Sequence, residues 1–105
     1  MKQILTLVLF DQLTKFIFFK YSVINFGYGF GLDIGGQFAL LVLPTIAFIL
    51  TKNKLIKAGI LGNLLNRIFL GYVPDFLYFG PIVCNLADIY ISIGIVQLIL
   101  YKREK

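Results

Sequence analysis

The sequence predicts an all-α integral membrane protein whose four transmembrane helices form a single domain over residues 1–105. Its composition is the first indication, because 59% of the residues are hydrophobic and the mean hydropathy is +0.89, whereas a soluble domain is about 45–50% apolar. Long apolar runs also recur along the chain, and a bilayer core of about 30 Å takes roughly 20 residues of helix. Four such helices with their connections use almost the whole chain.

The first helix is expected at about residues 2–21. A cleaved secretory signal would begin in a similar way, but Asp11 and Lys15 interrupt the apolar stretch and no small-residue cleavage site follows. We therefore expect a retained helix. Residues 22–36, which follow it, hold five of the ten glycines together with several aromatic residues. This composition predicts turns or short strands at the outer membrane interface.

The other three helices are expected at about residues 37–51, 55–74 and 80–101. The second has few polar residues and is expected to serve as a scaffold. Between the third and the fourth, the stretch YVPDFLYFGP contains two prolines and a glycine. These residues break helices and favour turns, so they predict a connection on the outer side.

The net charge of +5 is explained by membrane topology. Basic residues gather before the first helix, between the second and third, and after the fourth, and these places lie on one side of a four-span chain. The positive-inside rule then puts both termini and the central loop on the cytoplasmic side of the membrane, and no nucleic acid is expected as a partner. The basic residues are Lys2; Lys52, Lys54 and Lys57; and Lys102, Arg103 and Lys105, with Lys20 as the main exception.

Polar side chains recur at helical spacing on three of the predicted helices. Polar groups inside a membrane are costly, usually face the interior of a bundle, and often mark function. A structural interpretation stays open for several of them: Asp11 and Lys15 fit a pair that neutralises itself, and Asn63 and Asn85 fit hydrogen bonds between helices. The stripes consist of Asp11, Thr14 and Lys15; of Asn63, Asn66 and Arg67; and of Asn85, Asp88 and Ser92.

Asp75 and Asp88 are the candidate catalytic residues. They lie on consecutive helices that run in opposite directions, so both carboxylates are expected at a similar depth near the outer side. Close carboxylates have pKa values that move apart, as a general acid and a general base require. The sequence has no histidine and one cysteine, Cys84, which leaves no usual zinc site and no expected cofactor. Aspartic hydrolysis fits this inventory, and so does a proton relay in a transporter.

Five sequence blocks, in order, resemble those of the lipoprotein signal peptidases, the type II signal peptidases of bacteria. The blocks read D-x-x-T-K, N-x-G-x-A-F-G, G-G-x-x-G-N-x-x-D-R, G-x-V-x-D-F and F-N-x-A-D. The matching residues are Asp11, Thr14 and Lys15; Asn25, Gly27, Phe30 and Gly31, with Gly29 where alanine is usual; Gly59, Gly62, Asn63 and Arg67; Gly71, Val73, Asp75 and Phe76; and Asn85, Ala87 and Asp88.

This resemblance implies an intramembrane aspartic endopeptidase that removes the signal peptide from diacylglyceryl-modified prolipoproteins, just before the lipidated cysteine. It assigns catalysis to Asp75 and Asp88, with the active site toward the outer leaflet. Membrane lipid and the peptide-like inhibitor globomycin are the other implied partners. The implied residues for substrate binding and support are Asn25, Asn63, Arg67, Asn85, Asp11 and Lys15.

The chain departs from the family pattern at several points. Asn66 replaces the aspartate before the arginine, which removes the nearest expected partner of Arg67. Asn25 follows Lys15 by only ten positions, and twelve residues lie between the two catalytic candidates, so the outer cradle and flap are expected to be reduced. A catalytically weak or silent relative that still binds lipidated peptides is therefore one alternative. A small proton-coupled exporter is another.

Overall fold

The computed structural model describes residues 1–25 and 36–104. Four α-helices, one short 3₁₀ helix and four three-residue strands make up this part of the chain. Their bounds are α1 Lys2–Ile17, η1 Phe19–Tyr21, β1 Val23–Asn25, α2 Gly36–Leu50, α3 Lys54–Phe69, β2 Val73–Asp75, β3 Leu77–Phe79, β4 Ile82–Cys84 and α4 Leu86–Glu104.

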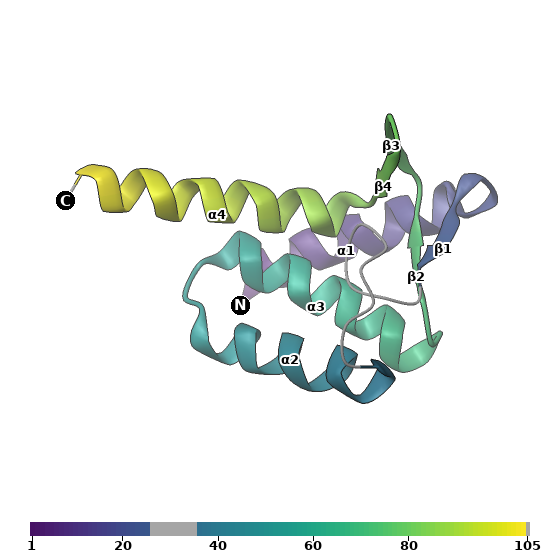
Figure 1. Cartoon of the computed structure of the whole chain (residues 1–105), viewed down its shortest axis with the longest axis horizontal. Helices are drawn as coiled ribbons and strands as arrows, with labels where there is room; N and C mark the ends of the chain where they lie inside the picture. The colour runs from purple at the N-terminus through teal and green to yellow at the C-terminus, as the bar shows by residue number, and fades with distance from the viewer. Residues whose placement is uncertain (26–35, 105) are drawn as a thin grey trace.

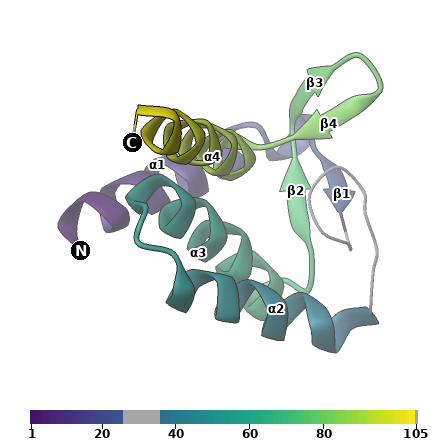
Figure 2. The same ribbon diagram turned by 60° about the vertical axis from the view of Figure 1, so that its left-hand side comes forward.

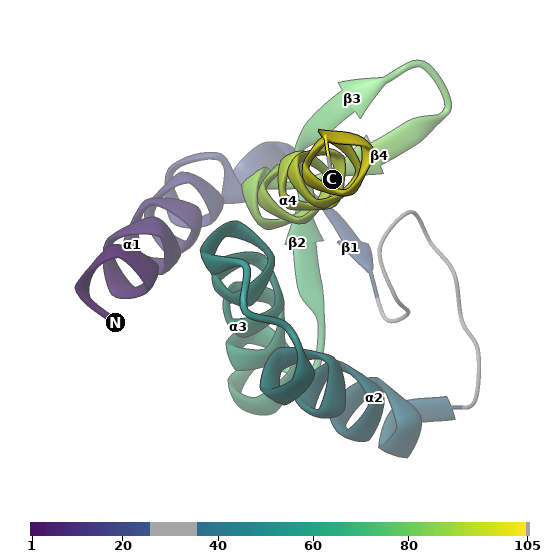
Figure 3. The same cartoon turned by 90° about the vertical axis from the view of Figure 1, so that its left-hand side faces the viewer.

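The helices form a small bundle around α3, which packs against α1, α2 and α4 (Figure 3). Along the chain the helices alternate in direction, so α1 and α3 end where α4 begins (Figure 1). All four strands gather at this end of the bundle, away from both termini (Figures 1 and 2). The strands and the first turn of α4 therefore meet the ends of α1 and α3.

Two two-stranded antiparallel sheets correct the prediction of an all-α protein. The strand β1 pairs with β2, so that Val23 lies opposite Asp75 and Asn25 opposite Val73. The strands β3 and β4 form a hairpin whose turn contains Gly80 at a φ of +63°. The residues expected to close the third helix and open the fourth are thus strands. The third helix ends at Phe69 because Gly71, just after its C-cap, adopts a φ of +82° that ends helices. Pro74 then keeps the following residues out of a helix, because proline has no N–H for one and disfavours helical backbone before it.

The prediction of four transmembrane helices is also wrong for the part of the chain that the structure describes. None of its helices combines the length and the apolar composition that crossing a membrane requires. The helices α1, α2 and α3 contain 16, 15 and 16 residues, fewer than the roughly 20 that a bilayer core takes. The helix α4 contains 19 residues, but it begins next to Asp88 and ends with charged residues.

Small side chains on α3 allow the helices to approach closely. Ala58 is fully buried and belongs to an apolar core with Ile4 and Val8 of α1 and Tyr90 of α4. The hydroxyl of Tyr90 also donates a 3.0 Å hydrogen bond to the backbone carbonyl of Leu7. This core fixes α1 and α4 on α3. Outside it, large apolar side chains are exposed along α1, α2 and the second half of α4.

Candidate active site

Seven polar or charged side chains are buried where α1, α3, β2 and the start of α4 meet. A polar group is costly to bury unless it is hydrogen-bonded, and these side chains hydrogen-bond to one another. Six of the eight predicted site residues are among them, whereas Arg67 is half-buried and Asn25 ends β1. The seven are Asp11 and Lys15 on α1, Asn63 and Asn66 on α3, Asp75 on β2, and Asn85 and Asp88 at the start of α4.

Asn85 connects the two candidate catalytic aspartates. Its side-chain Nδ2 donates a 2.7 Å hydrogen bond to Oδ1 of Asp75, and its backbone N–H donates to Oδ2 of Asp88 over 3.2 Å. In return, the backbone N–H of Asp88 donates to Oδ1 of Asn85 over 3.1 Å. This reciprocal arrangement is a capping box, in which residues at N-cap and N3 satisfy each other's backbone N–H groups. The start of α4 therefore fixes Asp88 and, through the same amide, Asp75.

The two carboxylates also share the thiol of Cys84 as a neighbour. The backbone N–H of Phe76, next to Asp75, donates to the carbonyl of Cys84 over 3.0 Å, which holds the end of β2 beside the end of β4. Burial raises the pKa of the Cys84 thiol, and the negative charges of Asp88 and Asp75 raise it further. Cys84 and Asp88 also line the same cavity.

Asn63 and Lys15 extend the network from Asp88 back to α1. The amide of Asn63 donates a 3.1 Å hydrogen bond to Oδ1 of Asp88, and its carbonyl oxygen accepts from the Lys15 ammonium over 2.9 Å. Lys15 also donates to Oδ2 of Asp11 and to Oδ1 of Asn66, each over 2.7 Å. The three N–H groups of this ammonium thus each have an acceptor. Asp11 and Lys15 do form the predicted ion pair, but the pair is part of a larger network.

Asp11 contacts two other helices. Its Oδ1 accepts a 2.9 Å hydrogen bond from the backbone N–H of Ala87, in the first turn of α4. This N–H group has no partner within its own helix, because the first four N–H groups of a helix never do. On the α3 side, a Cβ atom at Gly62 would overlap the Asp11 carboxylate. Only glycine at position 62 therefore leaves room for Asp11 in this place.

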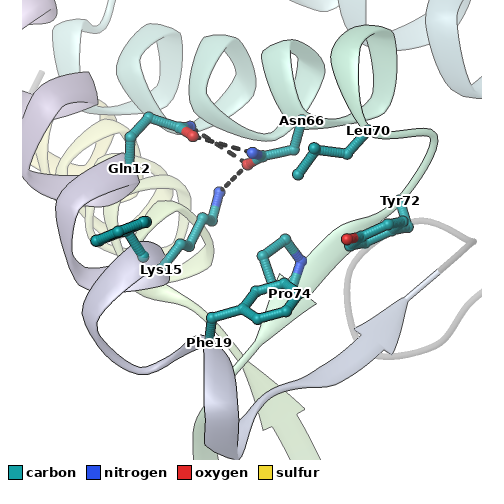
Figure 4. A pocket seen from close by; sticks show the side chains of 8 residues that line it. Gln12, Lys15, Phe19, Asn66, Leu70, Tyr72 and Pro74 are labelled. Carbon is teal, nitrogen blue, oxygen red and sulfur yellow. Dashed lines mark hydrogen bonds between the residues drawn. The ribbon is translucent and has the colours of Figure 1, made fainter.

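Gln12 is a member of the network that the sequence analysis missed. Its Nε2 donates to the carbonyl of Gly62 over 2.9 Å and lies 3.2 Å from Oδ1 of Asn66, whose Nδ2 donates back over 2.9 Å (Figure 4). Asn66 therefore hydrogen-bonds to α1, through both Gln12 and Lys15. Gln12 precedes Lys15 by three residues, and this shared helical face was the available signal.

Asp88 lines two cavities on different sides of α4. One, of about 280 Å³, is also lined by Asn63 and Arg67 of α3 and by apolar residues of α2. The other, of about 300 Å³, is also lined by Cys84, Ser92 and the β3–β4 hairpin. A carboxylate that is only 6% exposed therefore still borders space that a ligand can enter.

The block around Asn25 and the residue Thr14 are two further parts of the sequence prediction. Asn25 ends β1 opposite Val73, while Gly27, Gly29, Phe30 and Gly31 lie outside the described residues. Thr14 donates its hydroxyl to the carbonyl of Asp11 within α1. Over residues 1–25 and 36–104, no three or more His, Cys, Asp or Glu residues are placed to hold a metal ion together.

Comparison with known proteins gives one family. The sequence matches the family described as signal peptidase (SPase) II over residues 3–102. It is 39% identical over 105 aligned positions to a lipoprotein signal peptidase of Aquifex aeolicus, in an alignment that covers 76% of this chain and 62% of that protein. It is 34% identical over 137 aligned positions to a lipoprotein signal peptidase of Thermodesulfovibrio yellowstonii, covering 97% and 92% of the two chains.

The fold is also similar to that of a bacterial membrane enzyme solved by the in meso method at 2.3 Å resolution. The two structures have a TM-score of 0.84 at 22% sequence identity, over 96% of this chain and 85% of that chain. At this identity the likeness concerns the fold. In sequence, the match spans less than two thirds of the Aquifex aeolicus protein.

Proposed function

The chain belongs to the signal peptidase II family, and on that premise we propose that it is an aspartic endopeptidase with Asp75 and Asp88 as its catalytic pair. Its substrates are diacylglyceryl-modified prolipoproteins, from which it removes the signal peptide just before the lipidated cysteine. The observation that carries the proposal is the bridge through Asn85, which hydrogen-bonds to both carboxylates.

The mechanism uses the two carboxylates in different protonation states. Carboxylates that share a buried site do not both ionise readily, so one becomes the general base and the other the general acid. The ionised aspartate takes a proton from a water molecule, and this water attacks the scissile carbonyl carbon. The protonated aspartate donates a hydrogen bond to the carbonyl oxygen, where negative charge develops. The C–N bond of the tetrahedral intermediate then breaks, the proton that was taken from water passes to the leaving amine, and a new carboxyl group stays on the signal peptide.

Hydrogen bonds around Asp88 supply the fixed geometry that such a mechanism requires. Its two oxygens accept from Asn63 and from the backbone of Asn85, so rotation of the carboxylate would break both bonds. Donors that are already in place need no reorganisation during the reaction. The positive end of the α4 dipole adds a favourable field for negative charge at this position.

The cavity of about 280 Å³ between α2, α3 and α4 supports a place for the substrate. It brings Asn63, Arg67 and Asp88 to one wall, with Leu43 and Ala47 of α2 among its apolar residues. In the proposal, Arg67 and Asn63 bind carbonyl oxygens of the peptide while the apolar residues contact its hydrophobic part. Asn25 holds the substrate from the outer side, as the family pattern implies.

We further propose that the enzyme acts at the bacterial cytoplasmic membrane, with its active site toward the outer leaflet. Exposed apolar side chains on α1, α2 and α4 support contact with lipid. Phe16, Leu50 and Phe69 are 81%, 76% and 78% exposed, and exposed apolar surface of this kind is typical of membrane or protein contact sites. Globomycin is the expected inhibitor.

Cleavage of a purified lipid-modified preprolipoprotein tests this function. The unsubstituted chain should release the signal peptide, and globomycin should inhibit the release. Asp75→Asn and Asp88→Asn should each abolish cleavage, because each removes a proton carrier while keeping the size of the side chain.

The alternative of a silent relative predicts a different result in the same assay. Such a chain would bind the lipidated substrate without cutting it, and neither asparagine variant would change the outcome. Cleavage that persists in both variants would contradict the aspartic mechanism. The family match over residues 3–102 argues against an exporter.

A further inference from the structure

Gln12 and Asn66 form a two-way amide pair between α1 and α3. The Nδ2 of Asn66 donates to Oε1 of Gln12 over 2.9 Å, and Nε2 of Gln12 lies 3.2 Å from Oδ1 of Asn66 (Figure 4). Nε2 of Gln12 also donates to the carbonyl of Gly62 over 2.9 Å. The rotation of the Asn66 side chain is therefore set from the neighbouring helix.

The orientation of Asn66 determines which of its side-chain atoms faces the Lys15 ammonium. With Nδ2 turned toward Gln12, the Oδ1 of Asn66 faces the Lys15 ammonium and accepts from it over 2.7 Å. The same ammonium donates to Asn63, whose amide donates in turn to Asp88. A continuous series of hydrogen bonds thus runs from Gln12 through Asn66, Lys15 and Asn63 to a proposed catalytic carboxylate.

The amide pair borders a different cavity from the one proposed for the substrate. Gln12, Lys15 and Asn66 line a cavity of about 670 Å³ between α1, α3 and β2, whose other walls include Phe19 and Tyr72 (Figure 4). Neither of the two cavities at Asp88 is lined by Gln12. An effect of Gln12 on the reaction therefore has to pass through other residues.

We propose that Gln12 is a positioning residue of the peptidase: by orienting Asn66 it fixes Lys15 and Asn63, and through them the carboxylate of Asp88. This inference rests on the proposed function. At position 66 the asparagine amide supplies both the acceptor for Lys15 and the donor to Oε1 of Gln12.

Gln12→Met is the first test, since methionine has a similar length and none of the hydrogen bonds. Misplacement of a catalytic group costs rate, and we expect kcat to fall about ten- to a hundredfold. We expect KM for the lipidated preprolipoprotein to stay within about twofold, because Gln12 does not touch the substrate. Gln3→Met is the matched control: Gln3 lies on the same helix, also bonds to α3 through Lys54, and is exposed.

A double-mutant cycle tests the route through Asn66. If Gln12 acts by orienting Asn66, then Gln12→Met should lower kcat of the Asn66→Ala variant by less than about threefold, since coupled residues are not additive. Gln12→Glu is the second variant, in case Gln12→Met does not fold. It keeps an acceptor for Asn66 but loses the donor to Gly62 and adds a charge beside Asp11, so it should also lower kcat.

Thermal unfolding of every variant checks that the fold is retained. Unchanged kcat in folded Gln12→Met and Gln12→Glu, multiplicative effects with Asn66→Ala, or a rise in KM alone would each overturn the inference. A failure of the proposed function looks different, because the unsubstituted chain would then cleave nothing.

Discussion

The side chain of Asn85 donates a 2.7 Å hydrogen bond to Asp75 across a separation of ten residues. The hairpin of β3 and β4 fills this separation and returns the chain to the end of β2. Because Asn85 also caps α4 and bonds to Asp88, one amide joins the beginning of a helix to the end of a strand. The Asn85 amide therefore links the two aspartates, together with the backbone hydrogen bond from Phe76 to Cys84 that holds β2 beside β4.

Replacing Asn85 separates its two roles. Asn85→Ser keeps an oxygen that can cap α4 but removes the amide donor to Asp75. We expect the folded chain to lose about 1–3 kcal/mol of stability, since buried Asp75 loses a donor. The rate of prolipoprotein cleavage should fall at least about tenfold, because one carboxylate loses its fixed position. Cleavage kinetics together with thermal unfolding measure the two effects.

Asn53→Ala provides the control for this prediction. Asn53 caps α3, where its side chain accepts from the backbone N–H of Ile56 over 3.0 Å. Loss of such a cap costs typically about 1 kcal/mol, so this variant should be less stable and yet cleave at the normal rate. Equal loss of cleavage in both variants would mean that helix stability, and not the Asp75 contact, controls the site.

Lys15→Met is expected to destabilise the folded chain strongly. The Lys15 side chain is 2% exposed and that of its partner Asp11 is fully buried. Removing one partner of a buried ion pair leaves an uncompensated charge, at a cost of about 3–5 kcal/mol in the free energy of unfolding. Denaturant unfolding of the detergent-solubilised chain measures this change.

The double variant Asp11→Asn, Lys15→Met is the control for charge. It removes both members of the pair, so we expect it to recover part of the lost stability, although Lys15 also bonds to Asn63 and Asn66. Lys20→Met tests the loss of a lysine that is exposed, and it should leave stability within about 0.5 kcal/mol. If Lys15→Met were no more harmful than Lys20→Met, the buried pair would not be a stabilising part of this fold.

Cys84 should react slowly with iodoacetamide in the folded chain. The thiolate is the reactive form, and burial together with the charges of Asp88 and Asp75 raises the pKa of the thiol. A raised pKa means less thiolate at a given pH, so the pH at which labelling accelerates should be higher in the folded chain than in the chain unfolded by denaturant. Labelling rates between pH 7 and 10 measure this shift.

Asp88→Asn should lower the pKa of Cys84 and increase labelling at a fixed pH, because it removes a negative charge near the sulfur. Thermal unfolding of the variant checks that the increase does not come from a loosened fold. An unchanged labelling rate in a stably folded Asp88→Asn variant would contradict the proximity of this carboxylate to the thiol.

The amino-acid sequence alone was enough to predict the family and the residue types in the buried polar network. Ordered blocks from Asp11 to Asp88 indicated signal peptidase II, and the family match over residues 3–102 confirms it. Helical spacing also indicated which polar residues share a face, as Asp11 and Lys15 do. Each sequence block and each helical face is defined by residues close together in the chain, so both can be recognised without a structure. The assignment of catalysis to Asp75 and Asp88 stays a prediction.

How the polar faces of the helices pack against one another is known only from the three-dimensional fold. The helix prediction failed around Pro74, where β2 pairs with β1, a segment about fifty residues earlier in the chain. In the same way, helical spacing did not indicate the partners of Asn66, which are Gln12 and Lys15 on α1. The physical reason is that strand pairing and buried hydrogen bonds depend on groups far apart in sequence. Helical periodicity does not specify which of these groups come together.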